Sequence, residues 1–352
     1  MKIRIKALIL AMVFVLTFIL ASCNGMDEGQ SQNKKVDDKI KIGLSFDSFI
    51  IERWQRDRDV FVSAAKELGA EVNVQNANGV LEEQKNQIKY LIEEKMDVIV
   101  IIAIDGFNLS EEVQMAKDKG IKVIAYDRLI CNADVDLYIS FDNEMVGTLM
   151  GQAMVDNGIG GKSVIMLGGS DSDNNVVLVE EGFKKVMRSN NVKILDTMHA
   201  AGWKAELAAD YIRDNFDTVS RVQGIMCGND NLASAVVPVL AEKRLAGDIM
   251  VVGQDADLEA CQRIVEGTQL MTVYKPVERL AQRAAECAVK LAKGEEITSE
   301  EGYSSMNDGT YDVPYIALEP LMVTEENMDE VIIASGFHLK EDVYLNVPDK
   351  SE

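Results

Sequence analysis

The chain has 352 residues, 47% of them hydrophobic, so it is long enough to bury one large core or two smaller ones. This composition excludes a disordered chain. A formal net charge of −22, without clusters of Lys and Arg, argues against nucleic acid and anionic membrane surfaces as partners and favours an uncharged small ligand.

The N-terminus has the three parts of a signal peptide. Basic residues precede an apolar run over 7–20, which is shorter than the roughly 20 residues that a membrane span needs. The run ends in Leu-Ala-Ser-Cys at 20–23, which resembles the bacterial lipobox, in which the Cys becomes the acylated new N-terminus. A plain secretory peptide that happens to end in Cys is the alternative. We predict a signal peptide over 1–22 and lipidation at Cys23, at the outer face of the cytoplasmic membrane.

Residues 24–38 are rich in Asn, Gln, Gly, Ser and charge and have no apolar period, so 23–38 is predicted to be a flexible, lipid-anchored tether. The folded part is expected to start near Lys39. The remaining cysteines are far apart, with no Cys-x-x-Cys and no His at metal spacing, so neither a metal nor a cofactor is expected. They are interpreted as small core residues, and the sequence leaves open whether any two form a disulfide: Cys131, Cys227, Cys261 and Cys287.

From Lys39 onward, short apolar runs rich in β-branched residues alternate with longer segments of helical period, which is typical of repeated βα units around a parallel sheet. A first series of strands is predicted at 40–46, 71–76, 98–102 and 122–126. A second series is predicted at 163–167, 193–198, 224–227, 248–252 and 268–273. Helices are predicted between them, among others at 60–68, 82–94, 111–119 and 232–243. The two series predict an α/β protein with two doubly wound parallel-sheet lobes.

Polar residues follow these predicted strands at their carboxyl ends, where open α/β sheets bind their ligands. Each Asp or Asn there has an alternative explanation as a helix N-cap or turn former. Arg53, Arg128 and Lys275 cannot be explained as caps. Together with the neighbouring carboxylates and amides, these cations supply the donors and acceptors needed to hold vicinal hydroxyls from several directions.

The chain has only two tryptophans, Trp54 and Trp203, and each lies in a polar segment. A flat indole ring can stack on the apolar face of a sugar while polar groups bind its edge. Ordinary core packing is the alternative for an isolated Trp. In combination with the cations and carboxylates at the strand ends, the two rings favour a sugar as the ligand.

A series of short motifs then points to one family. The motifs include Glu-Arg-Trp-Gln at 52–55, Ala-Tyr-Asp-Arg at 125–128, Tyr-Ile-Ser-Phe-Asp-Asn at 138–143, Asp-Asn-Asn at 173–175, Gly-Gln-Asp-Ala-Asp at 253–257, Met-Thr-Val-Tyr-Lys-Pro at 271–276 and Asn-Asp-Gly at 307–309. In this order they resemble the D-xylose-binding proteins of the type I periplasmic-binding-protein fold, from about Lys41 to Phe337. These proteins are the substrate-binding components of sugar transporters.

The resemblance implies sugar contacts from both lobes, with Lys275 at a crossover between them. Trp54 is added because of its indole ring. Two departures, Ser-Asp-Ser before Asp173 and Ala-Ala before Gly202, put the fine selectivity among pentoses and hexoses in doubt. The predicted ligand-binding residues are Arg53, Trp54, Asp127, Arg128, Asp173, Asn175, Trp203, Asn229, Asp255 and Lys275.

The family fold further implies three crossing segments, expected near 143–147, 274–277 and 306–310. An N-terminal lobe would comprise 39–144 and 276–306, and a C-terminal lobe 145–275 and 307–347. The sugar would bind in the cleft between them and shift the population toward the closed state.

Two other classes of function fit less well. Asp pairs in a cleft can hydrolyse glycosidic bonds, but the chain has only two His and no nucleophile-elbow or phosphate-loop motif. The predicted Asp residues also lie beside cations or amides that would keep them ionised, so we expect no enzyme. A sugar-responsive repressor shares the fold, but the signal peptide and tether stand where its helix-turn-helix would be.

The partner in the membrane stays open. Proteins of this type deliver sugar to the permease of an ABC transporter, which is the commoner role and the one we favour. Others act as the ligand-sensing partner of a membrane histidine kinase. The sequence does not distinguish the two roles.

Overall fold

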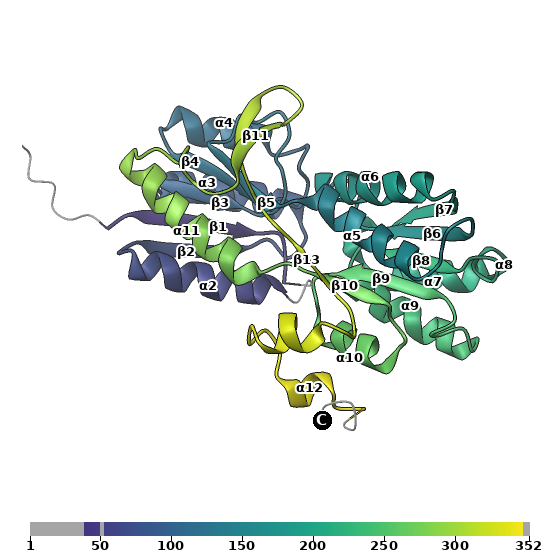
Figure 1. The fold of residues 1–352 in the computed structure, drawn as a ribbon. Coiled ribbons are helices and arrows are strands. Elements are labelled where there is room, and N and C mark those ends of the chain that lie inside the picture. The colour runs from purple at the N-terminus through teal and green to yellow at the C-terminus, as the bar shows by residue number, and fades with distance from the viewer. Residues whose placement is uncertain (1–38, 50–52, 348–352) are drawn as a thin grey trace, which may run out of the picture. The chain divides into compact units, whose positions relative to one another are not determined.

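The computed structural model describes residues 39–49 and 53–347, which form two α/β lobes (Figure 1). The first lobe is built on a seven-stranded sheet and the second on a six-stranded sheet. No helix in these two ranges is long and apolar enough to cross a membrane. The predicted signal peptide, the predicted tether over 23–38 and the lipidation site Cys23 lie outside the described residues.

The first sheet has the strand order β11-β12-β5-β4-β3-β1-β2. Its neighbouring strands are parallel except for β11 and β12, which form an antiparallel hairpin at one edge. The bounds are β1 (Lys41–Phe46), β2 (Glu71–Asn76), β3 (Val98–Ile101), β4 (Lys122–Tyr126), β5 (Leu137–Phe141), β11 (Tyr303–Asn307) and β12 (Asp312–Leu318).

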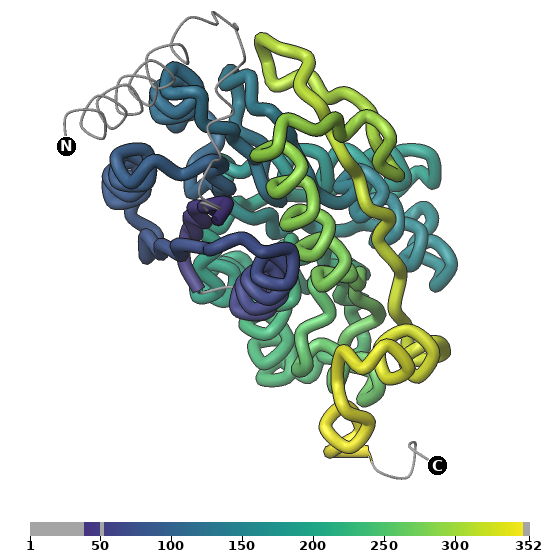
Figure 2. Tube along the Cα trace, turned by 90° about the vertical axis from the view of Figure 1, so that its left-hand side faces the viewer, coloured from purple at the N-terminus to yellow at the C-terminus, as the bar shows by residue number. Residues whose placement is uncertain are grey.

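Helices cover both faces of the first sheet, so its central strands are continuous apolar runs. Val98 and Val100 of β3 belong to the core formed with α2 and α11, whereas Ile99 and Ile101 point to the core formed with α3 and α4. Figure 2 shows α11, in light green, beside α2, in purple. The bounds are α2 (Arg53–Glu67), α3 (Leu81–Glu93), α4 (Ser110–Asp118) and α11 (Val277–Lys293).

The second sheet has the order β13-β10-β9-β8-β6-β7 and is parallel except where β13 pairs with β10. Helices α5 and α6 cover one face, and α7, α9 and α10 cover the other. The bounds are β6 (Ser163–Gly168), β7 (Lys193–His199), β8 (Gly224–Cys227), β9 (Met250–Gln254), β10 (Met271–Tyr274), β13 (Leu321–Val323), α5 (Asn143–Asp156), α6 (Asn174–Ser189), η1 (Ala201–Trp203), α7 (Ala205–Asp214), α8 (Phe216–Val219), α9 (Asp230–Glu242), α10 (Leu258–Glu266), η2 (Asp329–Ile333) and α12 (Lys340–Val343).

Helices α5 and α6 pack closely because glycines stand at their contact. A Cβ atom at Gly147 would lie 1.8 Å from the Val179 carbonyl oxygen, and one at Gly182 would lie 2.0 Å from the Glu144 oxygen. Only a residue without a side chain lets the two backbones approach this far. The contact fixes the position of α6, whose first turn carries predicted site residues.

The chain passes between the two sheets near the first two predicted crossings, after β5 and after β10. The third prediction, near 306–310, is wrong, because this segment is the turn of the β11–β12 hairpin. Its Asp308 carboxylate accepts hydrogen bonds from the backbone N–H groups of Thr310 and Tyr311, which closes the turn. The chain returns to the second sheet only between β12 and β13, so the expected lobe boundary at 306/307 moves to about 319.

The four cysteines within the described ranges are free thiols and are buried, as predicted for core residues. Burial raises the pKa of Cys131 to about 11 and that of Cys287 to about 12. Thiols with such pKa values remain protonated at neutral pH and are poor nucleophiles.

The close contact between α5 and α6 predicts that one added methyl group strongly lowers stability. Gly147→Ala places a Cβ against the Val179 carbonyl, and we expect it to lower the free energy of unfolding by about 3 kcal/mol, measured by urea unfolding. Gly160→Ala is the control, because a Cβ there would meet a single atom at 3.9 Å. Equal stabilities for both variants would contradict the close packing.

Candidate functional site

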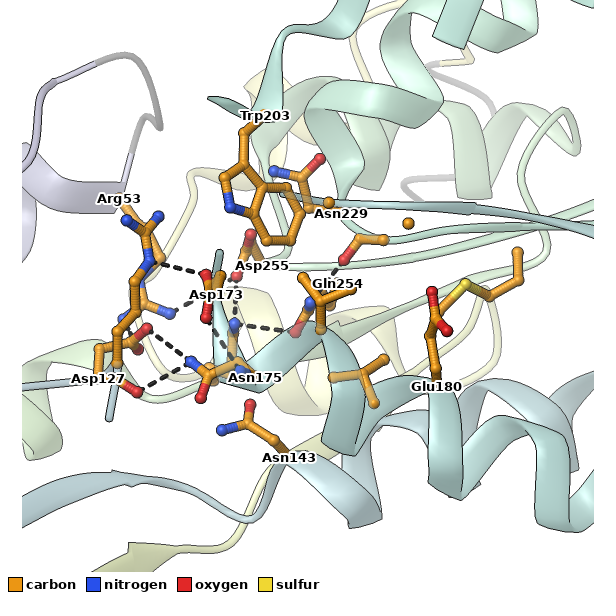
Figure 3. A pocket seen from close by; sticks show the side chains of 18 of the residues that line it. Arg53, Asp127, Asn143, Asp173, Asn175, Glu180, Trp203, Asn229, Gln254 and Asp255 are labelled. Atoms are coloured by element: carbon orange, nitrogen blue, oxygen red, sulfur yellow. Dashed lines mark hydrogen bonds and ion pairs between the residues drawn. The ribbon is translucent and has the colours of Figure 1, made fainter. Parts of the chain in front are cut away.

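Residues at the carboxyl ends of strands from both lobes line one cavity (Figure 3). The structure brings all ten predicted ligand-binding residues to its wall: Arg53, Trp54, Asp127, Arg128, Asp173, Asn175, Trp203, Asn229, Asp255 and Lys275. Their contact with a sugar stays a prediction. All ten side chains are largely buried, so their charges are paired within the protein.

The first lobe contributes Asp127 in a fixed conformation. This residue follows β4 and has a φ of 63°, a left-handed conformation that is uncommon for residues other than Gly. Ser140 and Tyr138 donate hydrogen bonds of 2.7 and 3.2 Å to its carbonyl oxygen and hold the turn. Its carboxylate accepts a 2.6 Å hydrogen bond from Arg53 Nη2. Burial alone would raise the pKa of Asp127, but Arg53, Lys275 and Arg128 outweigh it and lower that pKa.

Arg128 joins the two lobes. Its Nη1 donates to Asp47 Oδ2 at 2.7 Å and to the Ala103 carbonyl at 2.9 Å, both in the first lobe. Its Nε lies 2.8 Å from Asp173 Oδ2 in the second lobe. Burial disfavours the charge, but Asp47, Asp173 and Asp127 raise the pKa of Arg128 above its ordinary value. The guanidinium is therefore a permanent charge held by two carboxylates.

The second lobe places two of its predicted residues at helix N-termini. Asp173 caps α6, where its side chain accepts from the Asn175 N–H, and Asn229 caps α9, where its side chain accepts from the Leu232 N–H. The local capping explanation is therefore correct for both. A cap also fixes the side chain, and both caps line the cavity, so the capping and binding roles are compatible.

Asp255 and Lys275 form another part of the cavity wall. Lys275 Nζ lies 2.7 Å from Asp255 Oδ1 and donates to Gln254 Oε1 at 2.9 Å. Asp255 and Ala256 both have positive φ, 100° and 54°. The fully buried Asp230 carboxylate supports this strained loop, because it accepts a hydrogen bond from the Asp257 N–H at 3.2 Å.

The two indole rings are buried in the wall of the cavity. The Trp54 ring makes an edge contact with Phe46 and has Arg53 Cζ 4.4 Å from its centre, and its Nε1 has no hydrogen-bond acceptor in the described structure. The Trp203 ring lies against Gly169, where a Cβ would come within 2.2 Å of ring atoms. Gly169 therefore makes room for the ring.

Further contacts cross between the lobes in this structure. Asn175 Nδ2 donates to the Asp127 carbonyl at 2.9 Å, and Arg53 Nη1 lies 3.6 Å from Asp255 Oδ1. With the Arg128–Asp173 ion pair, these contacts show the lobes engaged with one another. Both lobes therefore contribute donors and acceptors to the wall of the cavity.

Sequence reasoning missed three polar residues that line the cavity, Asn143, Gln254 and Glu180. The first two lie within the motifs at 138–143 and 253–257, and Gln254 directly precedes the predicted residue Asp255. Glu180 lies inside α6, where its carboxylate pairs with His199 Nε2 and Lys184 Nζ, each at 2.6 Å. Nothing in a helical stretch distinguishes such an inward-facing Glu from a surface one.

The cavity can bind an uncharged polyhydroxyl compound by hydrogen bonds. Its carboxylates are acceptors, its guanidinium and ammonium groups are donors, and its rings supply flat apolar surface. Within residues 39–49 and 53–347, no group of His, Cys, Asp and Glu side chains is placed to hold a metal ion.

Comparison with known proteins agrees with this geometry. Residues 42–296 match the family described as periplasmic binding protein domain. The "D-xylose-binding periplasmic protein" of Haemophilus influenzae is 42% identical over 97% of this chain and 99% of its own length. The protein of the same name from Escherichia coli is 43% identical over 85% of this chain and 91% of its own.

Solved structures agree as well. An ABC transporter solute-binding protein from Clostridium phytofermentans with bound β-D-glucose superposes with a TM-score of 0.78, at 27% identity, over 86% of this chain and 99% of that one. A carbohydrate transporter solute-binding protein from Chloroflexus aurantiacus in complex with D-glucose gives a TM-score of 0.76, at 28% identity, over 86% and 97%.

Proposed function

The chain belongs to the periplasmic binding protein family, and from this premise we propose that it is an exported receptor for a monosaccharide, with D-xylose as the favoured ligand. The observation that carries the proposal is the convergence of ten polar and aromatic side chains from both lobes on one cavity. The relatives that match most of its length are binding proteins, so the chain is a binding protein and not an enzyme, as the sequence predicted.

The energetics of the cavity support a small neutral sugar. Micromolar affinity needs about −8 kcal/mol. Hydrogen bonds to charged groups contribute roughly 1.5–3 kcal/mol each, so a few of them together with ring stacking exceed the cost of ordering. Because the three cations are already matched by neighbouring carboxylates, a charged ligand would unbalance the site.

The names of the relatives favour xylose over other monosaccharides, and those of the solved structures favour transport. We infer that the closed form delivers its sugar to the permease of an ABC transporter. Sensing through a membrane histidine kinase is the alternative. Sugar-dependent binding to the outer domain of such a kinase, without any uptake defect after deletion of this protein, would favour the alternative.

Titration with single sugars tests the ligand. We expect xylose to bind the mature protein more tightly than ribose, galactose or glucose in calorimetry, with a change in Trp fluorescence because both rings line the cavity. If a hexose binds as tightly as xylose or more tightly, the ligand assignment is wrong.

Removing the residue that joins the lobes tests the site. Arg128→Ala leaves Asp47 and Asp173 without their cation, and we expect xylose affinity to fall about 100-fold or more. Arg213→Ala is the control, because Arg213 pairs with Asp210 at the surface and should leave affinity unchanged. A loss of stability without a loss of affinity would identify Arg128 as part of a structural ion pair only.

Lipid anchoring at Cys23 is proposed from the lipobox-like sequence. Cys23→Ala removes the acceptor thiol, so we expect the protein to leave the membrane fraction and to lose incorporation of labelled palmitate. Cys131→Ala is the control, since that thiol is buried in the first lobe. Membrane retention and labelling of Cys23→Ala would contradict the anchor.

A further inference from the structure

Arg53 has ionic partners in both lobes. Asp127, at 2.6 Å, and Asp57, at 3.4 Å, belong to the same lobe as Arg53, whereas Asp255, at 3.6 Å, belongs to the other lobe. Separation of the lobes carries Asp255 away. The partners that remain to orient Arg53 in an open cleft are therefore Asp127, which lines the cavity itself, and Asp57, which does not.

Asp57 links the two elements that carry the first lobe's site residues. It lies one helical turn after Arg53 on α2 and is 1% exposed. The Tyr126 hydroxyl donates a hydrogen bond to Asp57 Oδ1. Tyr126 is the last residue of β4 and directly precedes Asp127 and Arg128. This contact therefore ties the start of α2 to the end of β4.

The second oxygen of Asp57 is directed to Arg53. Asp57 Oδ2 and Arg53 Nε are both buried and have no hydrogen-bond partner in the described part of the chain, although they are 3.4 Å apart. Each of these two atoms is the ionic partner of the other, and removal of either would leave a buried polar atom without a partner, which is unfavourable. Tyr126 prevents the carboxylate from rotating away.

We propose that Asp57 is a positioning residue for sugar recognition, which holds the Arg53 guanidinium in place while the lobes are apart, with Tyr126 fixing the Asp57 carboxylate. The proposal rests on the proposed function, because Arg53 must bind the sugar for its position to affect affinity. Asp57 contributes no atom to the cavity wall. Its effect is transmitted through Arg53.

The charge on Asp57 depends on pH near neutrality. Burial raises its pKa to about 6, and the repulsion of Asp127 adds to this, whereas Arg53 and the hydrogen bond from Tyr126 oppose it. These three groups are the titratable or charged groups that face Asp57 from α2, from β4 and from the turn after β4. Protonation below this pKa weakens the attraction to Arg53, so sugar affinity should fall on acidification.

The test compares xylose affinity at about pH 5 and about pH 7.5 by calorimetry, with thermal unfolding measured in parallel. Asp57→Asn mimics the protonated carboxyl, and we expect it to bind about tenfold more weakly at the higher pH and to lose the wild-type change between the two. Tyr126→Phe frees the carboxylate and should weaken binding in the same direction. Asp59→Asn, on the exposed side of α2, is the matched control and should behave as wild type.

The outcomes separate this inference from the function. If the wild type binds none of the sugars, the proposed function fails. If the wild type binds and Asp57→Asn binds equally well at both pH values, the positioning role is wrong. A drop in unfolding temperature with wild-type affinity would also overturn it. Should Asp57→Asn not fold, Tyr126→Phe decides, and wild-type affinity with wild-type pH dependence in that variant contradicts the proposal.

Discussion

The Arg128 guanidinium is the group on which the arrangement of the cavity depends. It is buried and binds Asp47 in one lobe and Asp173 in the other, at 2.7 and 2.8 Å. A buried charge is tolerated only when it is paired. Removal of the cation or of either carboxylate would therefore leave a buried charge without its partner, which is strongly unfavourable. This three-membered contact joins the two halves of the site, together with the Asn175–Asp127 and Arg53–Asp255 contacts.

The protein itself holds several residues of the surrounding site in place. Asp127, Trp203 and Asp255 all have positive φ, a conformation that persists only where neighbouring contacts enforce it. Each is held by such contacts, from hydroxyls, from a bare glycine or from a buried carboxylate. Hydrogen-bonding groups fixed in this way lose little entropy on binding, which favours affinity for a small ligand.

The regular parts of the fold could be predicted because they depend on local apolar patterns. The strands β4 and β8 begin and end where the sequence places them. The start of α2 could not be predicted from such a pattern, because its first turns bury the charged residues Arg53 and Asp57. The predicted start at 60 is therefore seven residues late. The third crossing near 306–310 was an inference from the family resemblance, whereas the hairpin found there depends on the pairing of β12 with the distant strand β5. The sequence predicts that ten residues share one site. It does not predict the burial of Asp57 and Glu180, because each is held by a partner from another element, Tyr126 and His199 respectively.

The third crossing of the chain between the two sheets, between β12 and β13, comes late in the sequence, and this has a consequence for biogenesis. The first sheet lacks β12 until residue 318 has been made, and the second lacks β13 until residue 323. Both sheets therefore depend on pairings between distant parts of the chain, which form slowly. A nascent polypeptide can complete neither sheet until nearly all of the described part of the chain has been made, which is compatible with the export that we propose.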